Sequence, residues 1–169
     1  SFSSGSSCQQ FGITYQNTGV PVGPGQTYFW DFGAGAIPAT STQPNPGVIT
    51  YTSGGVKTVS LIVGYQGCTD ASVLQITVHP GPIVNAGADV EFCDGEGGVQ
   101  VNGSVNGGTP TYFYNWWCDD PGNCGISNNA IANPTMNPNI GTATDTVTYY
   151  FQVTDINGCT SNIDSVEVV

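Results

Sequence analysis

The segments TVSLIVGYQGC at residues 58–68 and TYYFQVTDINGC at residues 148–159 decide the fold. In both, apolar side chains recur at every second position and a Gly-Cys pair follows. Another alternating stretch comes next, SVLQITV at residues 72–78 and DSVEVV at residues 164–169. A period of two is typical of a strand with one buried face, and a Gly-containing turn between two such strands predicts a β-hairpin. The sequence therefore predicts the same hairpin twice.

An aromatic strand precedes each hairpin, TYFWDF at residues 27–32 and TYFYNWW at residues 111–117. A Trp on a central strand is typical of the core between two packed sheets. Between the halves lies His79-Pro80-Gly81-Pro82, and two prolines around a glycine exclude a central strand there. We therefore predict an all-β chain of two tandem immunoglobulin-like β-sandwich domains, residues 1–80 and 81–169.

The composition limits the classes of function. Lys and Arg together number 1 against 12 acidic residues, so the formal net charge is −11. Nucleic acid phosphates repel such a polyanion, and we expect no nucleic-acid partner. The chain lacks an apolar run of the ~18 residues that a membrane helix needs, so we expect no membrane insertion. Hydrophobic residues at 38% and aromatic residues at 11% are enough to fill a core.

The chain contains six cysteines, an even number, with one His and no CxxC motif. This pattern favours disulfides over a metal site and indicates an oxidising, extracellular compartment. In each half, one Cys precedes the first strand and another follows the hairpin turn, and two further Cys flank the turn sequence DDPGN. The predicted pairs are Cys8–Cys68, Cys93–Cys159 and Cys118–Cys124.

The first half carries WDFGAG at residues 30–35, Asn45-Pro46, and YTSGGVKTVSLIV at residues 51–63. On these motifs residues 8–78 closely resemble a polycystic-kidney-disease-type (PKD) domain, a family with an immunoglobulin-like β-sandwich fold. Ala34 stands where the family usually has Asp, and Lys57 where it usually has Tyr. The resemblance implies that the fold motif consists of Trp30, Asp31, Gly33, Gly35, Tyr51 and Gly55.

The second half begins with NAGADVEFC at residues 85–93 and ends on YYFQVTDINGCTSNIDSVEVV at residues 149–169. These phrases are similar to the opening and closing of repeats in giant cell-surface adhesins of gliding Bacteroidetes-type bacteria. The resemblance covers about residues 85–169, except the insert around Cys118–Cys124. It implies sandwich repeats in series, displayed as filaments, with neighbouring repeats or copies of the same protein as partners.

Catalytic candidates are few. His79, the single histidine, lies in the predicted linker, and no GxSxG motif occurs. Asp119-Asp120 lies in a Pro-Gly turn, which favours a solvated turn over an acidic pair. We therefore predict no enzymatic activity and no required cofactor.

Calcium is the cation that the acidic residues suit best, because hard cations prefer several carboxylate and carbonyl oxygens. Asp89 and Glu91 open the second half, and a calcium site would bring them close to the turn at Asp155 or to the linker between the halves. The alternative is that scattered carboxylates keep the chain soluble.

The aromatic stretch at residues 112–117 permits two interpretations. Alternation puts Tyr112, Tyr114 and Trp116 on one face, and Phe113 and Trp117 on the other. One face forms the core, and the other is either an exposed surface for stacking on the sugar rings of a surface polysaccharide or a covered structural face. The candidate platform residues are Tyr112, Tyr114, Trp116 and Trp117.

Three positions match glycosylation signals. Asn102 opens an Asn-Gly-Ser sequon. Thr146 and Ser165 each follow an Asp and precede a Val, which resembles the O-glycosylation signal of the same bacterial group. Ordinary strand residues are the alternative.

These inferences predict a non-catalytic structural or adhesive repeat segment of a secreted bacterial surface adhesin or extracellular filament. We expect it outside the cell or at the cell surface. Two alternatives stay open at this stage: an accessory carbohydrate-binding module of a secreted hydrolase, and a subunit that self-assembles by strand addition at a sheet edge.

Overall fold

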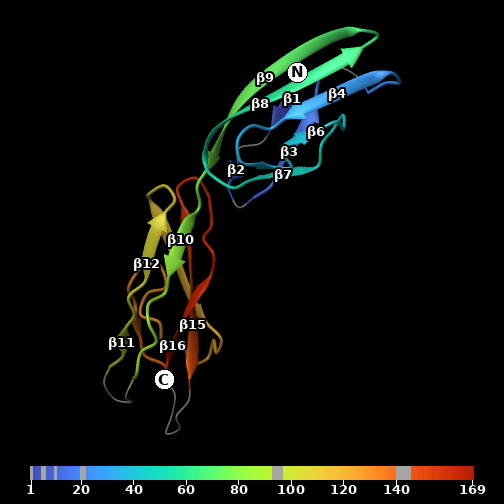
Figure 1. Cartoon of the computed structure of the whole chain (residues 1–169). Coiled ribbons are helices and arrows are strands. Elements are labelled where there is room, and N and C mark those ends of the chain that lie inside the picture. The colour runs from blue at the N-terminus through green and yellow to red at the C-terminus, as the bar shows by residue number, and fades with distance from the viewer. Residues whose placement is uncertain (1, 5–6, 10, 20–21, 93–96, 140–145) are drawn as a thin grey trace. The chain divides into compact units, whose positions relative to one another are not determined.

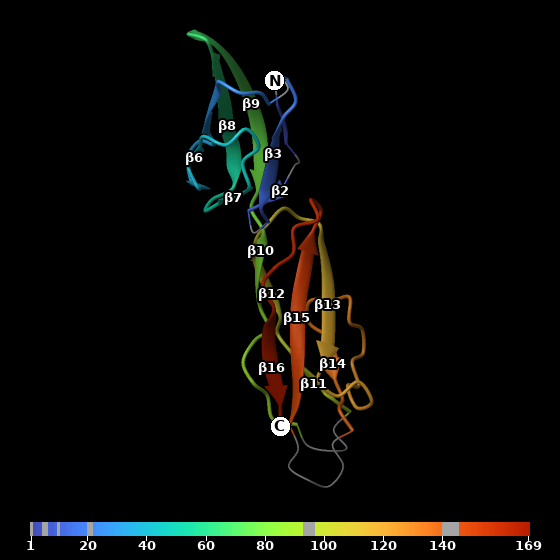
Figure 2. The same cartoon turned by 90° about the vertical axis from the view of Figure 1, so that its right-hand side faces the viewer.

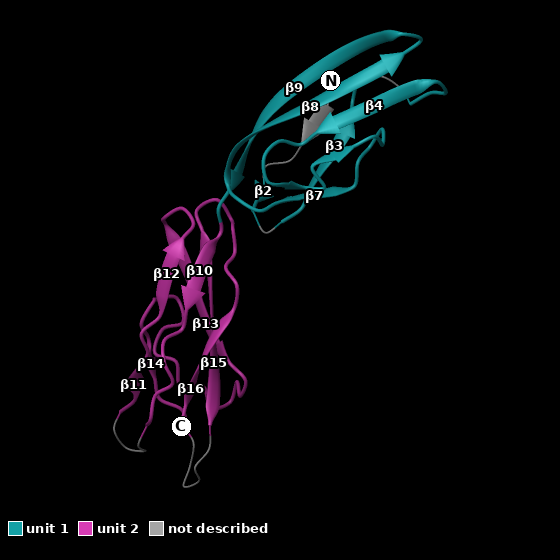
Figure 3. Cartoon of the chain, in the orientation of Figure 1, with its two compact units in different colours: residues 1–80 teal, residues 81–169 magenta. Residues whose placement is uncertain are grey.

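Figure 1 shows the computed structural model of the chain, which describes residues 2–4, 7–9, 11–19, 22–92, 97–139 and 146–169. Every regular element in these ranges is a β-strand, so the predicted all-β class is confirmed. The same ranges contain no helix that meets the length and apolarity needed to cross a membrane. The chain divides into two compact units, unit 1 at residues 1–80 and unit 2 at residues 81–169 (Figure 3).

Unit 1 consists of two sheets, one smaller than the other. The smaller sheet contains β1 (Phe2–Ser4), β3 (Ile13–Asn17), β7 (Val48–Tyr51) and β5 (Ala36–Ile37). The larger sheet contains β2 (Ser7–Cys8), β9 (Cys68–His79), β8 (Gly55–Tyr65), β4 (Gln26–Asp31) and β6 (Thr40–Ser41). The pair β2–β9 is parallel and all other pairs in both sheets are antiparallel.

The core of unit 1 lies between these two sheets. It joins Tyr15 from the smaller sheet to Trp30 and Leu61 from the larger one, and all three side chains are buried. The Tyr15 hydroxyl lies 2.9 Å from the Tyr51 hydroxyl, which donates in turn to the Phe32 carbonyl at 2.8 Å. The aromatic core that the sequence predicts is therefore tied together by hydrogen bonds.

The turn after β4 depends on its Asp and Gly residues. The Asp31 carboxylate accepts a hydrogen bond from the Gly33 N–H at 2.9 Å. Gly33 has φ +79°, and a Cβ there would lie 2.7 Å from the Thr58 carbonyl oxygen, so only glycine fits. Gly35 and Gly55 also adopt positive φ, at 79° and 104°. These contacts and backbone angles explain why the WDFGAG turn needs Asp at position 31 and Gly at positions 33 and 35.

Unit 2 contains three groups of antiparallel strands. β10 (Pro82–Asn85) pairs with β12 (Ser104–Gly107), and β11 (Val99–Gln100) pairs with β14 (Thr135–Met136). The largest group is formed by β13 (Tyr112–Cys118), β15 (Val147–Asp155) and β16 (Asp164–Val168), which lie side by side in Figure 2. Along β15 buried and half-buried positions alternate without interruption, as the sequence predicts.

One predicted disulfide of unit 1 is wrong. Cys68 is an exposed free thiol, whereas Cys8 is buried and disulfide-bonded. Cys8 pairs with His79 at the last residue of β9, and Cys68 is the first residue of that strand. The 12 residues of β9 span roughly 36 Å at about 3.3 Å per residue. A disulfide requires Cα atoms within about 7 Å, so the Cys8–Cys68 bridge is geometrically excluded.

In unit 2 the short predicted bridge is present. Cys118 and Cys124 are bonded, with a Cα–Cα distance of 5.8 Å. Of the other predicted pair, Cys159 is buried and disulfide-bonded, and Cys93 lies outside the described residues.

Candidate functional site

The aromatic strand β13 turns one face into the core of unit 2. Trp116 is buried and stacks on Phe151, with ring centroids 4.2 Å apart and an interplanar angle of 13°. Its indole N–H donates to the Ile131 carbonyl at 3.1 Å. Tyr112 and Tyr114 are half-buried and pack against the same core. Three of the four predicted platform residues are therefore structural, because alternation assigns them to the face that the core covers.

The fourth predicted residue, Trp117, lies on the opposite, outward face. It is directly across from Tyr150 in the β13–β15 pair, and the two rings stack with centroids 5.6 Å apart and an angle of 22° between their planes. Both side chains are half-buried, and neither belongs to the core cluster. Phe113, four residues earlier on the same face, is 59% exposed.

A groove of about 690 Å³ is lined by Trp116, Trp117 and Cys118 of β13. The loop that the Cys118–Cys124 bridge closes, with Pro121, lines one part of it, and the segment from Ile126 to Asn129 lines another. The volume lies within the range of small-ligand sites. The lining residues of the groove thus combine Trp117 with the polar residues Ser127, Asn128 and Asn129.

Hydrogen bonds fix the segment that carries the amides. The backbone N–H of Trp116 donates to the Asn129 carbonyl at 3.0 Å, and the backbone N–H of Ser127 donates to the Thr135 carbonyl at 3.0 Å. Asn128 Oδ1 accepts from the Ala130 N–H at 2.9 Å, so the amide NH₂ group is the part of Asn128 left for a ligand. The polar wall of the groove is thus pre-formed.

The opposite loop is also anchored. The Tyr149 hydroxyl donates to the Cys124 carbonyl, and the buried Tyr149 ring connects this loop to the core. Burial, with a smaller effect of the Asp119 charge, raises the pKa of Tyr149 to about 12. Asp119 Oδ1 accepts from the Thr148 N–H at 3.2 Å, and Asp120 Oδ1 accepts from the Gly122 N–H at 3.2 Å. Exposed Asp120 therefore stabilises its own turn, whereas exposed Asp119 holds the end of β13 to the start of β15.

The predicted calcium cluster does not form. Asp155 is buried, and its carboxylate accepts three backbone N–H groups, those of Asn157, Cys159 and Thr109, each at 2.9 Å. An ionised carboxylate has about four lone-pair sites, so three N–H donors occupy most of its capacity to accept and leave little for a cation. Asp89 accepts from the Glu167 N–H near the other end of β15, because Glu167 pairs with Thr148.

Metal and catalytic candidates are sparse elsewhere in the described ranges. No group of three or more His, Cys, Asp and Glu side chains that could hold a metal ion occurs among those residues. Burial raises the pKa values of Tyr15 and Tyr51, and both hydroxyls lie inside the core of unit 1. His79 is half-buried at the end of β9, where its carbonyl accepts from the Gln9 N–H at 2.8 Å.

The three predicted glycosylation positions, Asn102, Thr146 and Ser165, all have exposed side chains. Exposure permits modification, and glycosylation stays a prediction that an intact-mass measurement tests.

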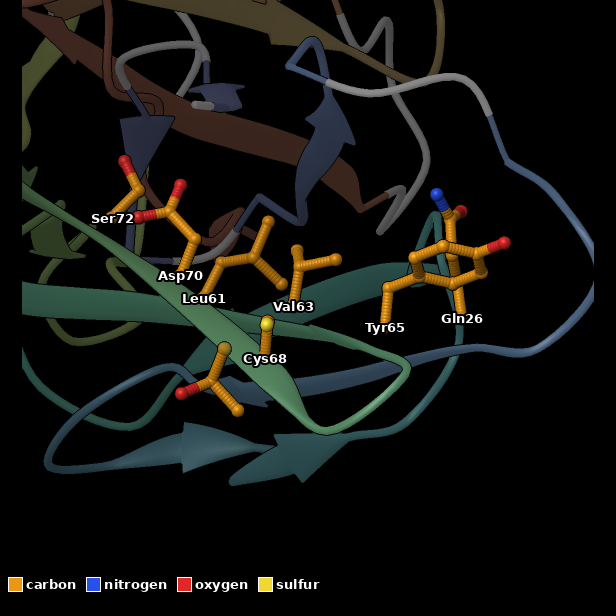
Figure 4. Close-up of a pocket in the computed structure, with 8 residues that line it drawn as sticks. Gln26, Leu61, Val63, Tyr65, Cys68, Asp70 and Ser72 are labelled. Carbon is orange, nitrogen blue, oxygen red and sulfur yellow. The ribbon is translucent and has the colours of Figure 1, made fainter.

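Unit 1 has a smaller hollow of about 310 Å³ on the inner face of the β8–β9 hairpin. Figure 4 shows Leu61 and Val63 between Asp70 and Ser72 on one side and Tyr65 and Gln26 on the other. It exists because β8 has 11 residues and β9 has 12, whereas β3 and β7 of the facing sheet have 5 and 4. The hairpin therefore extends beyond the layer that covers it.

Sequence reasoning missed several of these residues. Tyr150 had a usable signal, since alternation along TYYFQV points it outward, but its partner depends on the register between β13 and β15. Asn128 and Asn129 lie in an irregular polar segment that carries no periodic signal. The free thiol of Cys68 was assigned to a disulfide.

No family model matches the chain, and no curated protein matches it. Among solved structures it is similar to the fibronectin(III)-like modules of Clostridium thermocellum CbhA, at 14% identity over 99% of this chain and 93% of that one, with a TM-score of 0.38. A SusE-like surface located polysaccharide binding protein of Bacteroides thetaiotaomicron matches at 10% identity over 99% of this chain and 34% of that one, with a TM-score of 0.48. The human desmocollin-1 ectodomain matches at 11% identity over 94% of this chain and 32% of that one, with a TM-score of 0.37. In the second and third cases the chain spans about a third of the matched protein. These similarities identify no family, and the functional interpretation rests on the geometry of the chain itself.

Proposed function

We propose that the chain is a non-catalytic adhesive segment of a secreted bacterial surface protein, and that the groove beside Trp117 binds a neutral polysaccharide. The observation that carries the proposal is the outward stack of Trp117 on Tyr150 next to a pre-formed groove. The core of unit 2 is complete without these two rings, since Trp116 and Phe151 fill it from the inner face. The stacked pair lies outside the core and leaves the two rings beside the groove, where a ligand can reach them.

The chemistry of the groove suits a sugar. An indole face packs against the C–H side of a pyranose ring, and amide and hydroxyl groups of Asn128, Asn129 and Ser127 can exchange hydrogen bonds with its hydroxyls. The cation needed to clamp a phosphate, sulfate or carboxylate is missing, because Lys57 of unit 1 is the single basic residue of the chain besides His79.

The negative charge of unit 2 favours a neutral polysaccharide over an acidic one as the ligand. Asp31 and Asp70 are the two acidic residues of unit 1, so ten of the 12 lie in unit 2, which has no Lys or Arg. Such a surface repels an anionic glycan at distances up to the Debye length, about 8 Å at physiological salt. The expected ligand is an uncharged polysaccharide.

Affinity electrophoresis tests the proposal, with the full chain run through native gels that contain dextran, mannan, arabinoxylan or β-glucan. At least one neutral polymer is expected to retard the chain, and heparin is expected not to. Trp117→Ala should weaken retardation at least tenfold, about 1.4 kcal/mol. Phe113→Ala is the matched control, because Phe113 is an exposed aromatic residue on the same strand and face but outside the groove.

Two results would overturn the proposal. One is the absence of retardation by every neutral polymer. The other is an equal loss in both variants, which would indicate adhesion of the whole sheet face instead of a site in the groove.

A further inference from the structure

Strand β9 has a long open edge. On one side it pairs with β8 without interruption, from Val78 opposite Gly55 to Cys68 opposite Tyr65. On the other side β2 pairs with it at Val78 and His79 only. Within the described part of the chain, no strand pairs with the other side of residues 68–77, so a row of backbone N–H and C=O groups faces outward there.

The edge lacks the features that usually prevent pairing between chains. Residues 68–77 read CTDASVLQIT, with no Lys, no Pro and one charge, that of Asp70. β-favouring Thr, Val and Ile are frequent in this stretch. In natural proteins, lysines, prolines, β-bulges, inward-pointing charges or a short length keep edge strands from pairing with other chains. Apart from the charge of Asp70, residues 68–77 have none of these features.

The charge of unit 1 opposes its association with itself only weakly. Unit 1 contains Asp31, Asp70 and Lys57, so its formal charge is −1, whereas unit 2 carries the rest of the −11. Two copies of unit 1 therefore approach each other with little repulsion, which is not the case for unit 2.

We propose that a second copy of this chain adds its own β9 to this edge in antiparallel orientation, around a two-fold axis at Val73. Thr69 of one copy then faces Thr77 of the other, and the two Val73 side chains meet at the axis. In this register residues 69–77 of the two copies pair, and the pairing stops there because Cys68 of the second copy falls opposite Val78, which Ser7 of β2 already contacts. The result is one continuous sheet built from the larger sheets of both copies.

The paired side chains are compatible. On the outer face, Thr69–Thr77 and Val73–Val73 are pairs that stabilise antiparallel strands. The two Asp70 carboxylates lie six residues apart along the pair, roughly 20 Å, which exceeds the Debye length of about 8 Å at physiological salt. The dimer therefore does not bring the two Asp70 carboxylates close together.

Sedimentation velocity over a concentration series tests the dimer, with Cys68→Ser in every sample so that a disulfide between copies does not contribute. We expect a reversible dimer. Val73→Lys places two ammonium groups at the axis and is expected to raise the dimer dissociation constant at least tenfold. Val56→Lys is the control, since Val56 and Val73 are both 64% exposed but Val56 lies on the inner strand β8.

Circular dichroism spectra of both variants establish that each is folded before the comparison. A change of less than twofold for Val56→Lys, together with the tenfold change for Val73→Lys, supports pairing at the edge. A monomer at every concentration would overturn the proposal. Equal weakening by both lysines would overturn it as well, because that result indicates contact through the sheet face.

Discussion

The Oδ1 atom of Asp155 accepts a hydrogen bond from the backbone N–H of Cys159 at 2.9 Å, where the sequence suggested a calcium ligand. The same atom accepts from Asn157, and Oδ2 accepts from Thr109 at 2.9 Å. Asp155 thus fastens the turn after β15 to the loop before β13. Its role is to hold these two segments of unit 2 together by hydrogen bonds.

Asp155→Asn is expected to destabilise unit 2 by roughly 1–3 kcal/mol, because the new NH₂ group would face the Thr109 N–H and leave a buried donor without an acceptor. Urea unfolding followed by circular dichroism measures the change. Asp70→Asn is the control, since Asp70 is exposed and should change the unfolding free energy by less than about 0.5 kcal/mol. A fully stable Asp155→Asn variant would contradict the assigned role.

Calcium at millimolar concentration is expected to leave the melting temperature unchanged. Three N–H donors occupy most of the acceptor capacity of Asp155, and Asp89 already accepts from the Glu167 N–H. Differential scanning calorimetry with calcium chloride and with EDTA checks this. A rise of several degrees that EDTA reverses would show that a calcium site exists.

Alkaline pH is expected to destabilise unit 2 between pH 10 and about 12. Burial and then the Asp119 charge raise the pKa of Tyr149 from 10.0 to about 12, so the folded state binds its proton more tightly than the unfolded state does. This contribution is fully present below pH 10 and is lost as the pH rises through 12, on the order of 3 kcal/mol in total. Urea unfolding at pH 9 and pH 11 measures it. In Tyr149→Phe the fall should be shallower, and an identical fall would contradict the assignment to Tyr149.

Trypsin is expected to leave the folded chain intact. Lys57 is the one Lys or Arg in the sequence, it is 6% exposed, and it pairs with Ile76 near the open end of the β8–β9 hairpin. Its ammonium group lies 3.1 Å from the Ser53 hydroxyl and 5.5 Å from the centre of the Tyr51 ring. Mass spectrometry should find a single cut, after residue 57, and only in denaturant. Rapid cleavage of the native chain would contradict the burial of Lys57.

Alternation was enough to predict the long strands of both hairpins and their inward faces. The buried positions of β15 follow it residue by residue, because a half-buried strand leaves a strict period of two in the sequence. The turn at Asp155 also carried a signal, since Asp-Ile-Asn-Gly is typical of a turn in which Asp accepts backbone N–H groups. The prediction of a calcium site did not consider that Asp155 accepts hydrogen bonds within its own turn.

The cysteine pairing and the groove depend on information that alternation does not contain. Repeat symmetry suggested a bridge from Cys8 to Cys68, but the polarity and length of β9 carry Cys68 to the far end of the sheet. The stack of Trp117 on Tyr150 depends on the register between two strands that are distant in sequence. Long-range register is set by packing and turn geometry together, so a single sequence leaves it open.

Acrylamide quenching of tryptophan fluorescence tests the central claim most directly, because Trp30 and Trp116 are 0% and 1% exposed while Trp117 borders the groove. Acrylamide should quench the Trp117 component of the folded chain. A neutral polysaccharide that retards the chain should protect that component, and Trp117→Phe should remove both the quenching and the protection. A polysaccharide that binds the chain but leaves the quenching of Trp117 unchanged would contradict the account.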